Sequence, residues 1–383
     1  MQITGIICEY NPLHTGHKKQ IDFLKSQGHC VVCLMSGNFV QRGHPAIFDK
    51  MTRAQAAIAC GADLVLELPL PFALSSAEGF AQGGVEILSK ICDNICFGAE
   101  TADADRLLDT ANALLSPAFS EKLRHHLDRG LSFPAARAAA LADCGHNSEI
   151  LATPNNILAI EYCKAILMQN AQLKPIVIHR GGSYHDTQAD LDNPSATSLR
   201  QMMITHAPWQ CYVPKAAAVI FEKASVHTLQ LGEKAVLAKL RTMHDTEFEA
   251  LPFGSEGLWR KLMRASRSCS DLQSIIDETK SKRYTRTRID RMILCAYLGL
   301  TESLRTSTVP YCRVLAFNDA GRDLLRSVKD SGYFVNIGQR TNSDYEALEY
   351  RSTALYGLFA NQPEAPEMES KYRLIYHKTP AHD

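Results

Sequence analysis

Two histidines, His14 and His17, flank a threonine and a glycine in the stretch EYNPLHTGHKK. The stretch follows the apolar run ITGIICE and precedes residues with helical spacing, so we expect it to form the turn from a strand into a helix. A helix N-terminus offers unpaired amide groups and a partial positive charge to an anion, and Gly16 lets a phosphate approach the backbone closely. The H-x-G-H pattern therefore predicts that both histidines donate hydrogen bonds to one bound phosphate.

Two other interpretations of these residues stay open. Asn11 and Pro12 could form an ordinary turn that leaves both histidines on the surface. Zinc is a weaker alternative, because the sequence has no further ligand cluster with suitable spacing. The place of the pattern, after a strand and before a helix, favours the phosphate site, and we predict no metal held by protein ligands.

A second polar constellation lies in the segment SATSLRQMM, residues 195–203. Ser195 or Thr197 can cap the start of a helix, and Arg200 would project near the first turn of that helix. Hydroxyls, unpaired amides and a guanidinium together suit the outer oxygens of a triphosphate. Capping alone would explain the hydroxyls, but the segment follows the fifth expected strand and so returns to the same sheet edge as the two histidines.

Four further residues are candidates because of where they stand along the chain. Gly98, in FGAE, ends the fourth expected strand, beside the expected ligand cleft. Arg180 ends the fifth strand and could reach a nucleotide phosphate. Asn155 and Asn156 begin a helix in PNNILAIEY, where they could contact a ligand or simply serve as caps.

The motifs of several other enzyme classes are missing or weak. The sequence contains neither G-x-x-x-x-G-K-[ST] nor G-x-G-x-x-G, so neither a P-loop ATPase nor a dinucleotide enzyme is favoured. Cys30 and Cys33 have the spacing of a redox pair, but they lie within an expected strand and have no second pair. The polar loop 36–50 could hold Gln41 and Arg42 over a substrate or could be a plain connection.

Apolar runs alternate with helical segments through the first two hundred residues. Five runs are expected to be buried strands, at residues 3–9, 30–36, 63–69, 94–100 and 174–180. Helices are expected between them, at residues 15–27, 47–60, 76–90, 103–145 and 153–170. This alternation predicts an α/β fold with a doubly wound, Rossmann-like parallel sheet, in which ligands bind beyond the carboxyl ends of the strands.

The pattern changes after about residue 208. Residues 215–300 read mostly as helix, and a small strand–helix–strand unit near 312–337 and a final helix at 344–359 follow. We therefore expect a phosphate-binding α/β domain at residues 1–208. A mostly helical domain, which includes the small α/β unit, is expected at residues 209–383.

Composition limits the class of protein. Lys and Arg number 41, as do Asp and Glu, so the formal net charge is zero and any nucleic-acid surface must be a local patch. No apolar run approaches about 20 residues and no charged leader precedes an apolar core, so we expect neither a membrane span nor a secretory signal. The 12 cysteines are scattered, several within apolar stretches, as is usual for reduced thiols of the cytoplasm.

One such basic patch occurs in KSKRYTRTRIDRMILCAYLG, residues 280–299. Its members expected to contact RNA are Lys282, Arg283, Arg286, Arg288 and Arg291. Basic residues interleaved with an aromatic, here Tyr284, suit phosphates and stacked bases. The alternative is a solvated basic face ahead of a buried helix. Either way, we expect this patch to lie in a domain separate from the phosphate site.

Six segments, taken in order along the chain, resemble one known family. They are ICEYNPLHTGH, SGNFVQRG, DLVLELP, PNNILAIEY, SATSLR and KRYTRTRIDR. The H-x-G-H element alone marks the nucleotidylyltransferase superfamily, whereas the combination is similar to the bacterial tRNA(Met) cytidine acetate ligases. The resemblance implies that ATP and acetate are joined as acetyl-adenylate, and that the acetyl group passes to the wobble cytidine of elongator tRNA(Met) as N4-acetylcytidine. It also implies a cytoplasmic protein whose helical C-terminal domain helps to hold tRNA.

The resemblance further implies which residues bind ATP. The two histidines match the catalytic motif, and Gly98, Asn155 and Arg180 match ATP-binding positions. The other implied contacts form one segment: Ile7, Cys8, Glu9, Tyr10, Asn11, Pro12, Leu13, His14, Thr15, Gly16, His17, Lys18, Lys19 and Gln20. The chain departs from the family at His44, where an acidic residue is frequent, and beyond about residue 320, where it is short and divergent. These departures concern the loop and tRNA docking rather than the ATP chemistry.

The implied chemistry fits the residues. An acetate oxygen attacks the α-phosphorus and pyrophosphate leaves, a reaction that needs positioning and charge stabilisation rather than a covalent nucleophile. His14 and His17 would stabilise charge on the reacting phosphate, and Arg200 with Mg²⁺ would stabilise the leaving pyrophosphate. Two alternatives remain. A nucleotidylyltransferase for a small metabolite would need no basic patch, and a non-enzymatic RNA-binding protein would bind tRNA without pyrophosphate chemistry.

Overall fold

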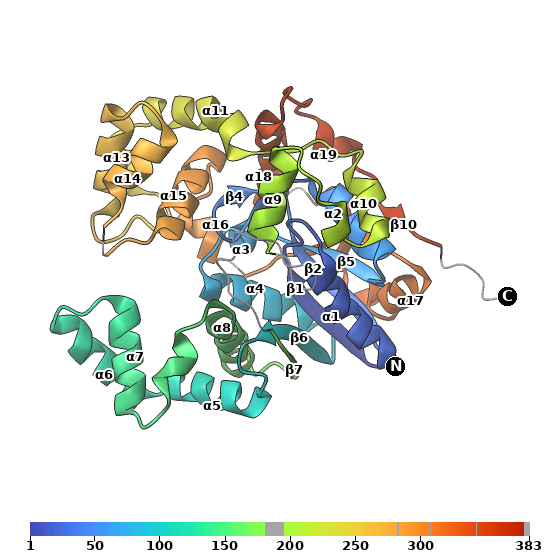
Figure 1. Ribbon diagram of the computed structural model, residues 1–383, viewed down its shortest axis with the longest axis horizontal. Helices are drawn as coiled ribbons and strands as arrows, with labels where there is room; N and C mark the ends of the chain where they lie inside the picture. Colours follow the sequence, from blue (N-terminus) through green and yellow to red (C-terminus); the bar gives the residue numbers. More distant parts are fainter. Residues whose placement is uncertain (181–194, 282, 307, 342, 379–383) are drawn as a thin grey trace.

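The computed structural model describes residues 1–180, 195–281, 283–306, 308–341 and 343–378. A central sheet of eight strands carries helices on both faces (Figure 1). Its strands are β1 Ile3–Cys8, β2 Cys30–Ser36, β5 Leu64–Leu68, β6 Asn94–Ala99, β7 Lys174–His179, β8 Cys312–Phe317, β9 Phe334–Asn336 and β10 Ile375–Tyr376. Across the sheet the order is β10-β8-β5-β2-β1-β6-β7, and β9 pairs with β8.

The five strands expected in the first half of the chain are confirmed, and they pair in parallel. From β1 the chain moves outward through β2 to β5, then crosses back to the other side of β1 and continues through β6 to β7. The sheet is therefore doubly wound, and its direction reverses between β1 and β6. In such sheets ligands bind at this reversal, beyond the carboxyl ends of the strands.

Strand β2 shows why the sheet is buried on both faces. Val32 and Leu34 belong to one hydrophobic core, while Val31 and Cys33 belong to another on the opposite face. Side chains alternate across a strand, so a strand covered on both sides must be apolar at every position. The first core is completed by α4 Ala77–Leu88, α5 Ala104–Leu115, α8 Pro154–Met168 and α17 Asp319–Ser327. The second is completed by α1 Thr15–Ser26, α2 Lys50–Ala59, α9 Ala196–Ile204 and α10 Lys215–Phe221.

The helical region that follows builds a third core of its own. Its helices are α11 Leu229–Thr242, α12 Asp245–Glu249, α13 Leu258–Ser268, α14 Leu272–Thr279, α15 Arg286–Leu298 and α16 Glu302–Thr306. Phe39, Leu70 and Leu348 also belong to this core, so the helical region is packed against the sheet domain. Phe39 lies in the short hairpin of β3 Phe39–Val40 and β4 His44–Pro45, and Leu70 begins α3 Leu70–Ala73.

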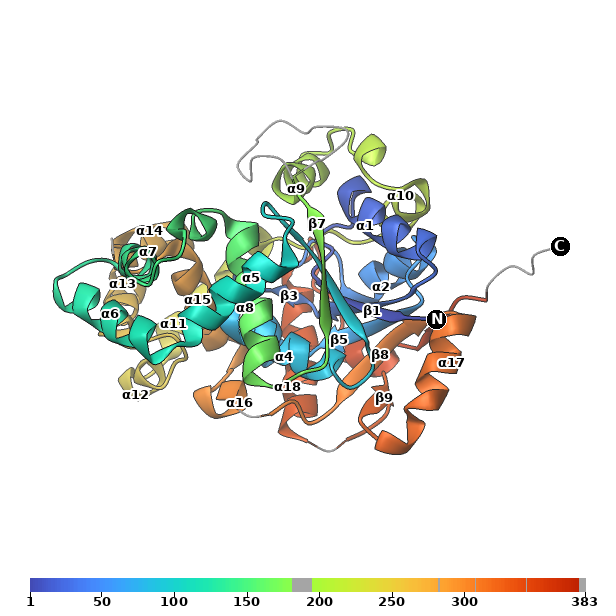
Figure 2. The same cartoon turned by 90° about the horizontal axis from the view of Figure 1, so that it is seen from below.

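Two groups of helices extend from the same side of the sheet (Figures 1 and 2). One contains α6 Pro117–Asp128 and α7 Phe133–Asp143, and the other contains α13 and α14. The chain ends with α18 Asp344–Tyr356 and α19 Met368–Lys371 before β10. No helix in the described ranges has both the length and the apolar character needed to cross a bilayer.

The small unit near 312–337 differs from the sequence expectation. Its strand, helix and second strand are present, but β8 extends the central sheet by pairing antiparallel with β5, with Leu64 opposite Phe317. The apolar strand CRVLAF buries five of its six residues by covering the β5 edge. The sequence assigns this unit to the C-terminal domain, because a sequence shows which elements are adjacent in the chain and not which strands pair in space. A domain boundary near residue 208, between the sheet domain and the helical region, stays a prediction.

Candidate active site

The turn after β1 is fixed from several directions. Tyr10 has a positive φ of 45°, and the peptide bond between Asn11 and Pro12 is cis. The Asn11 side-chain oxygen accepts a hydrogen bond from the Ile47 amide at 2.8 Å, and its carbonyl accepts one from Arg200 Nη1 at 2.8 Å. Residues from the loop 36–50 and from α9 thus set the path on which the chain enters α1.

His14 caps helix α1 through its own ring. The Gly16 amide donates to His14 Nδ1 at 3.1 Å, and the His14 amide donates to His17 Nδ1 at 3.4 Å. The two rings are stacked, with centroids 3.7 Å apart. Because each Nδ1 accepts a hydrogen bond, the proton of each neutral ring resides on Nε2. Both histidines therefore present an Nε2–H donor at the start of the helix.

The His14 donor is buried without a partner among the described residues. His14 is 1% exposed, and its Nε2 atom makes no hydrogen bond in this part of the chain. A buried donor left unpaired costs about 1–3 kcal/mol, so such a group usually has a ligand in the functional state. A donor beside a glycine at a helix N-terminus suits a phosphate oxygen.

Burial also keeps both rings neutral. It lowers the pKa of His14 to about 3, and the nearby Arg180 charge adds to the effect. Burial likewise lowers the pKa of His17 well below its usual value, with smaller contributions from His14 and Arg180. The two rings therefore act as hydrogen-bond donors without a formal charge, while the positive charge of the site comes from arginine.

Gly98 and Arg180 meet beside this turn, as their positions in the sequence predicted. The Arg180 amide donates to the Ala99 carbonyl at 2.8 Å, which extends the pairing of β7 with β6. A methyl group on Gly98 would lie 3.3 Å from Arg180 Cδ, so the glycine makes room for that side chain. The reversal between β1 and β6 therefore brings together the histidine turn, Gly98 and Arg180.

Helix α9 brings Arg200 to the same turn. Ser195 is the N-cap of α9 and accepts the Ser198 amide at 3.0 Å, as the sequence predicted. Arg200 Nη2 donates to Thr197 Oγ1 at 3.0 Å, while Nη1 reaches Asn11. The guanidinium is therefore oriented by two contacts, and it joins the start of α9 to the turn before α1.

The half-buried Glu9 and the buried Arg53 fix the ends of two strands, a role that sequence reasoning did not indicate. Glu9 Oε1 accepts the Gln41 amide at 2.7 Å, and burial raises its pKa. Arg53 is fully buried and donates to the carbonyls of Glu9, at 2.6 Å, and Ser36, at 3.1 Å. Arg53 thus ties the ends of β1 and β2 together. Its place in the amphipathic segment of α2 gave no indication of this role.

Asn155 and Asn156 have partners within the protein. Asn155 Nδ2 and the Asn156 amide donate to the two oxygens of Glu100 at 2.7 and 2.8 Å. The Thr101 amide donates to Asn156 Oδ1 at 2.9 Å. These bonds hold the loop after β6 against the N-terminus of α8. Glu100, which the sequence did not indicate, is therefore the residue that these asparagines orient, and their direct contact with ATP stays a prediction.

The segment Ile7–Gln20 divides into core and site residues. Leu13 is fully buried, and Tyr10 is buried with its hydroxyl 3.4 Å from Cys33 Sγ, so both side chains belong to the core. Gln20 Nε2 donates to the Cys96 carbonyl at 3.2 Å and so joins α1 to β6. Contacts of these residues with ATP through their side chains do not fit these positions, because the side chains are already packed or hydrogen-bonded.

The basic patch of α15 is used largely within the protein. Arg286 Nε pairs with the buried Asp290 at 3.1 Å, and Arg288 donates to the Phe253 carbonyl at 2.9 Å. Arg291 is only 8% exposed, which does not fit a direct RNA contact. Arg283 is the most exposed, at 67%, and lies 3.3 Å from Glu256. Lys282 lies outside the described residues.

The basic patch also contacts the loop that follows β2. Arg291 Nη1 donates to the Gln41 carbonyl at 3.2 Å, and the Gln41 amide is held by Glu9. A methyl group on Gly43 would come within 2.5 Å of the Arg291 backbone nitrogen, so only glycine fits there. Helix α15 therefore packs directly on the loop that follows β2, and the expectation that the patch belongs to a separate domain stays a prediction.

His44 lies beside the contact between the loop 36–50 and α15. His44 Nε2 lies 3.8 Å from Asp290 Oδ2. Burial lowers the pKa of His44 to about 4 and raises that of Asp290 to about 6. A second carboxylate at position 44 would face Asp290 directly, so the histidine found here avoids a like-charge contact.

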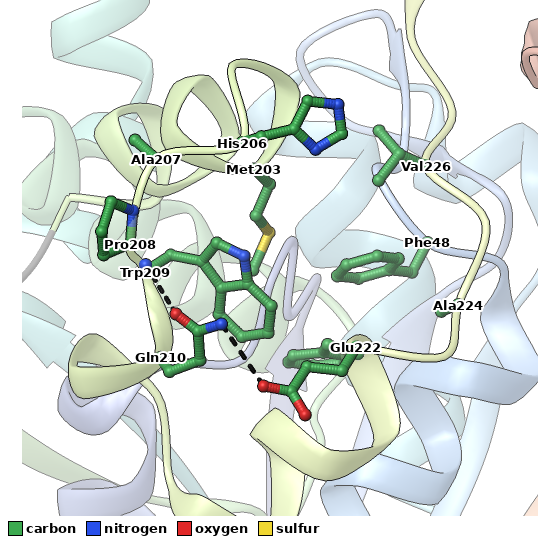
Figure 3. Close-up of a pocket in the computed structure, with 11 residues that line it drawn as sticks. Phe48, Met203, His206, Ala207, Pro208, Trp209, Gln210, Glu222, Ala224 and Val226 are labelled. Atoms are coloured by element: carbon green, nitrogen blue, oxygen red, sulfur yellow. Dashed lines mark hydrogen bonds between the residues drawn. The ribbon is translucent and has the colours of Figure 1, made fainter.

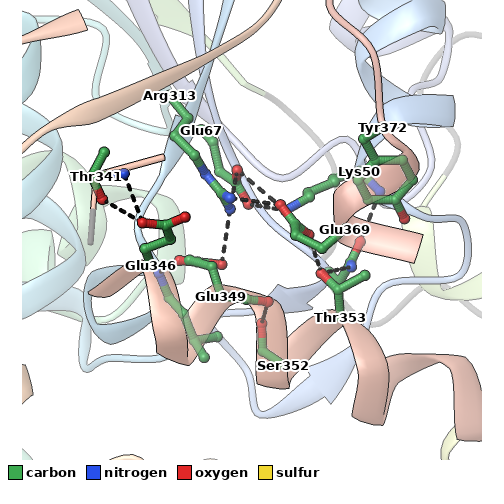
Figure 4. A network of polar contacts seen from close by, with 12 residues as sticks. Lys50, Glu67, Arg313, Thr341, Glu346, Glu349, Ser352, Thr353, Glu369 and Tyr372 are labelled. Atoms are coloured by element: carbon green, nitrogen blue, oxygen red, sulfur yellow. Dashed lines mark hydrogen bonds and ion pairs between the residues drawn. The ribbon is translucent and has the colours of Figure 1, made fainter. Parts of the chain in front are cut away.

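A buried ion network supports the other side of the same loop (Figure 4). Lys50 Nζ lies 3.0 Å from Glu67 and 2.8 Å from Glu369, and Arg313 Nη2 lies 2.7 Å from Glu67 and 3.3 Å from Glu349. Three carboxylates face two cations, so burial and the neighbouring Glu67 raise the pKa of Glu349 to about 7. The network joins strands β5 and β8 and the start of α2 to the C-terminal helices. Sequence reasoning missed it because its members come from distant segments.

A separate surface pocket of about 440 Å³ lies on another side of α9 (Figure 3). Phe48, Trp209 and Phe221 line it, and the rings of Phe48 and Phe221 stack at 4.7 Å. Met203 and His206 come from the C-terminal end of α9 and its following turn. None of the predicted ATP or RNA contacts lines this pocket, and its aromatic rings pack α9 and α10 against α2.

The described residues contain no group of three or more His, Cys, Asp or Glu side chains that could hold a metal ion. Mg²⁺ is usually held by one or two carboxylates together with phosphate oxygens of a substrate, so its participation stays a prediction. The 12 cysteines are all free thiols, and Cys30 and Cys33 are buried within β2, as the sequence predicted.

The histidine turn at the reversal of a parallel sheet defines the class of protein. The family model described as HIGH Nucleotidyl Transferase matches residues 1–371. The fold class inferred from the sequence is confirmed.

The particular family follows from close relatives. The tRNA(Met) cytidine acetate ligases of Clostridium novyi and Clostridium acetobutylicum are each 36% identical to this chain, covering 99% and 98% of it and 100% and 99% of their own lengths. Crystal structures of Thermotoga maritima TmcAL, in the apo form and bound with alpha-thio ATP, are 27% identical with TM-scores of 0.91 and 0.88. Each covers 99% of this chain and is itself covered completely. The chain belongs to the family of tRNA(Met) cytidine acetate ligases, and the resemblance found in the sequence is confirmed.

Proposed function

We propose that the protein is an ATP-dependent ligase that activates acetate as acetyl-adenylate and acetylates the wobble cytidine of elongator tRNA(Met). The observation that carries this proposal is the buried, unpartnered Nε2–H of His14 at the N-terminus of α1. The full-length relatives named for this activity support the same conclusion. So does the Thermotoga maritima relative bound with alpha-thio ATP.

The first step forms one bond to phosphorus and breaks another. A carboxylate oxygen of acetate attacks the α-phosphorus of ATP, and the bond from that phosphorus to the bridging oxygen of pyrophosphate breaks. Negative charge builds up on the phosphate oxygens during this exchange. The Nε2–H donors of His14 and His17, with the charge of Arg180, are placed to stabilise it.

The second step transfers the acetyl group. The exocyclic amine of cytidine attacks the acetyl carbon, AMP leaves with the carboxyl oxygen that had joined phosphorus, and the amine loses a proton. No covalent enzyme intermediate is needed. The amine must reach an adenylate held beside the histidine turn, so the target nucleotide has to be unstacked from its neighbours.

Arg200 has a positioning role in this proposal. Its contacts with Asn11 and Thr197 fix both the turn before α1 and the start of α9. The outer phosphates are assigned to this region, with Ser195 at the N-cap of α9 and Arg200 beside it. Mg²⁺, when bound, would add positive charge beside the outer phosphates, and its participation stays a prediction from the sequence. A cytoplasmic location likewise remains a prediction from the resemblance.

Arg283 and Arg286 are the members of the α15 patch whose exposure still suits RNA contact, at 67% and 41% for their side chains. The side chain of Arg288 is 23% exposed and pairs with Glu256, and that of Arg291 donates to the Gln41 carbonyl. The proposed role of Arg291 is to set the position of the loop that contains Gln41, whereas Arg288 holds the segment with Phe253 and Ser255. We therefore propose that RNA contact and ATP chemistry are physically linked through this loop.

Labelled acetate gives the test of this function. Incubation with ATP and elongator tRNA(Met) should place the label on N4 of the wobble cytidine, as read by nuclease digestion and mass spectrometry. Label in an acetylated or adenylated small molecule, with none in RNA, would favour the metabolite alternative. RNA binding without ATP consumption would favour the non-enzymatic alternative.

A further inference from the structure

Helix α13 carries a row of cations that points away from its buried side. Arg260, Lys261, Arg264 and Arg267 are all exposed, and the eleven residues of the helix include no acidic side chain. Positions separated by three, four and seven residues lie on one face of an α-helix. The opposite face is anchored by Leu258, Leu262 and Ala265, which are fully buried. The row is thus held on a rigid, well-packed helix.

Most of these charges are not neutralised by the protein. Within the described ranges, Arg260, Lys261 and Arg264 form no ion pair, whereas Arg267 pairs with Asp245. The α15 patch differs, because its arginines pair with Asp290 and Glu256. The whole chain has equal numbers of acidic and basic residues, so an unneutralised row on one helix face is a local excess. Such an excess attracts a polyanion.

A hollow at the C-terminal end of the row has the chemistry of a phosphate site. It measures about 380 Å³ and is lined by Arg241, Ser266, Arg267, Ser268, Cys269 and Ser270. Arg241 comes from α11 and is oriented by a bond from Nη2 to the Ser270 carbonyl at 3.0 Å. Two guanidiniums on one concave surface match the acceptor oxygens of a phosphodiester, whereas the hydroxyls of Ser266 and Ser268 donate to carbonyls of their own helix.

The helix also lies where a large ligand can reach it. In Figures 1 and 2, α13 is at the outer edge of the helical group, farther from the central sheet than α15. A tRNA is long enough to contact a surface remote from the reacting base. A surface far from the ATP site can therefore add affinity without entering the chemistry.

We infer that the exposed face of α13, with Arg241 and the hollow beside it, binds the phosphate backbone of the RNA substrate. The inference rests on the proposed function for the identity of the RNA. It assigns the main electrostatic contact to Arg260, Lys261, Arg264 and Arg241 rather than to the α15 patch. Backbone contacts of this kind position an RNA and carry no sequence information by themselves.

The first test neutralises two charges of the row. Arg260→Gln with Arg264→Gln should weaken binding of an elongator tRNA(Met) transcript and reduce the slope of log K against log salt by about 0.7–0.9 for each lost contact. The matched control is Arg326→Gln with Lys329→Gln, two exposed cations near α17 at another edge of the molecule. The control should leave affinity and slope unchanged.

A second pair of variants tests the hollow. Ser268→Asp places a negative charge beside Arg267 and should weaken tRNA binding, whereas Ser268→Ala should leave it near the wild-type value. Unfolding by urea checks that both variants keep their fold. Equal tRNA affinity in wild type and in the Arg260/Arg264 variant would overturn the inference, and so would equal losses in that variant and its control.

Acetate-dependent pyrophosphate exchange without tRNA separates this inference from the proposed function. The α13 variants should keep the wild-type exchange rate, because they lie outside the ATP site. If the wild-type protein shows no exchange, and the α13 variants bind RNA more weakly than the wild type, the function proposed above fails and the surface assignment stands. If exchange is normal and RNA affinity is unaltered by the variants, the surface assignment alone fails.

Discussion

The histidine turn and the α15 patch were both recognised from short sequence patterns, yet their side chains have different kinds of partners in the structure. At the turn, each histidine uses one ring nitrogen for a bond to nearby backbone and keeps the other available. In α15, the arginines are bound by acidic residues and carbonyls from other segments. The conformation of a short pattern can be predicted from sequence when its structural partners are local, whereas partners from distant segments are not indicated by the pattern itself.

The two regions are also joined. Arg291 contacts the Gln41 carbonyl, and Glu9 holds the Gln41 amide at the end of β1. A change in α15 can therefore reach the end of β1, beside the proposed ATP site, through a single loop residue. This contact makes the α15 patch a support for the ATP site as well as a candidate RNA surface.

The largest effect is expected at the histidine turn. His17→Ala removes an Nε2–H donor and should lower acetate-dependent pyrophosphate exchange about 100- to 1,000-fold, the usual cost of one transition-state donor. His29→Ala is the matched control, because His29 also makes one hydrogen bond, to Thr4 at 2.7 Å. An equal loss in both variants would show that the effect is structural.

Arg200 should have the next largest effect. Arg200→Lys keeps the charge but lacks the planar fork that bonds Asn11 and Thr197 together. Losing such a charged hydrogen bond costs about 1.5–3 kcal/mol, so we expect exchange to fall roughly 10- to 100-fold. Thr197→Val removes one acceptor only and should cost less. A wild-type exchange rate in Arg200→Lys would show that the reaction does not require the contacts of Arg200 with both Asn11 and Thr197.

Within the basic segment 280–299, we expect buried and exposed arginines to differ in their effect on stability. Arg291→Ala should lower the free energy of unfolding by about 1–3 kcal/mol, because its contact with the Gln41 loop is buried. Arg283→Ala should change it by less than about 0.5 kcal/mol, because the side chain is 67% exposed. Urea unfolding measures both. Similar values for the two variants would mean that the loop contact contributes nothing to stability.

A smaller, pH-dependent effect is expected at the ion network of Figure 4. The folded-state pKa of Glu349 is raised to about 7, so its contribution to stability is complete at low pH and is lost as pH rises through 7. Glu349→Gln mimics the protonated acid, so this variant should keep the contribution to stability at every pH. The stability of this variant relative to wild type should thus rise between about pH 5 and pH 8, on the order of 1 kcal/mol. A difference that stays constant with pH would show that Glu349 is ionised throughout.

Much of the sheet domain could be predicted from sequence, because the strands are continuous apolar runs and helix caps are local. Ser195 is the N-cap of α9 as expected, and His14 begins α1. The antiparallel pairing of β8 with β5 could not be predicted, because its two strands are far apart in the chain. The buried Arg53 was missed for a similar reason, since its partners are carbonyls of other segments.

The candidate site shows the same division. Gly98 and Arg180 were placed correctly because both stand at strand ends, where chain position and sheet topology decide the location. Asn155 and Asn156 were recognised at the start of α8, but their bonds to Glu100 and Thr101 depend on the loop after β6. Residue type and spacing predicted where these side chains are, and tertiary packing decided what they contact.

The most direct test of the account replaces His14 by asparagine. Asparagine is a good N-cap, so His14→Asn can still accept the Gly16 amide while it lacks the Nε2–H donor. The measurement is acetate-dependent exchange of labelled pyrophosphate into ATP without tRNA, alongside urea unfolding. We predict nearly unchanged stability with exchange reduced about 100- to 1,000-fold. Exchange near the wild-type rate in this folded variant would contradict the assignment of the His14 donor to the reacting phosphate.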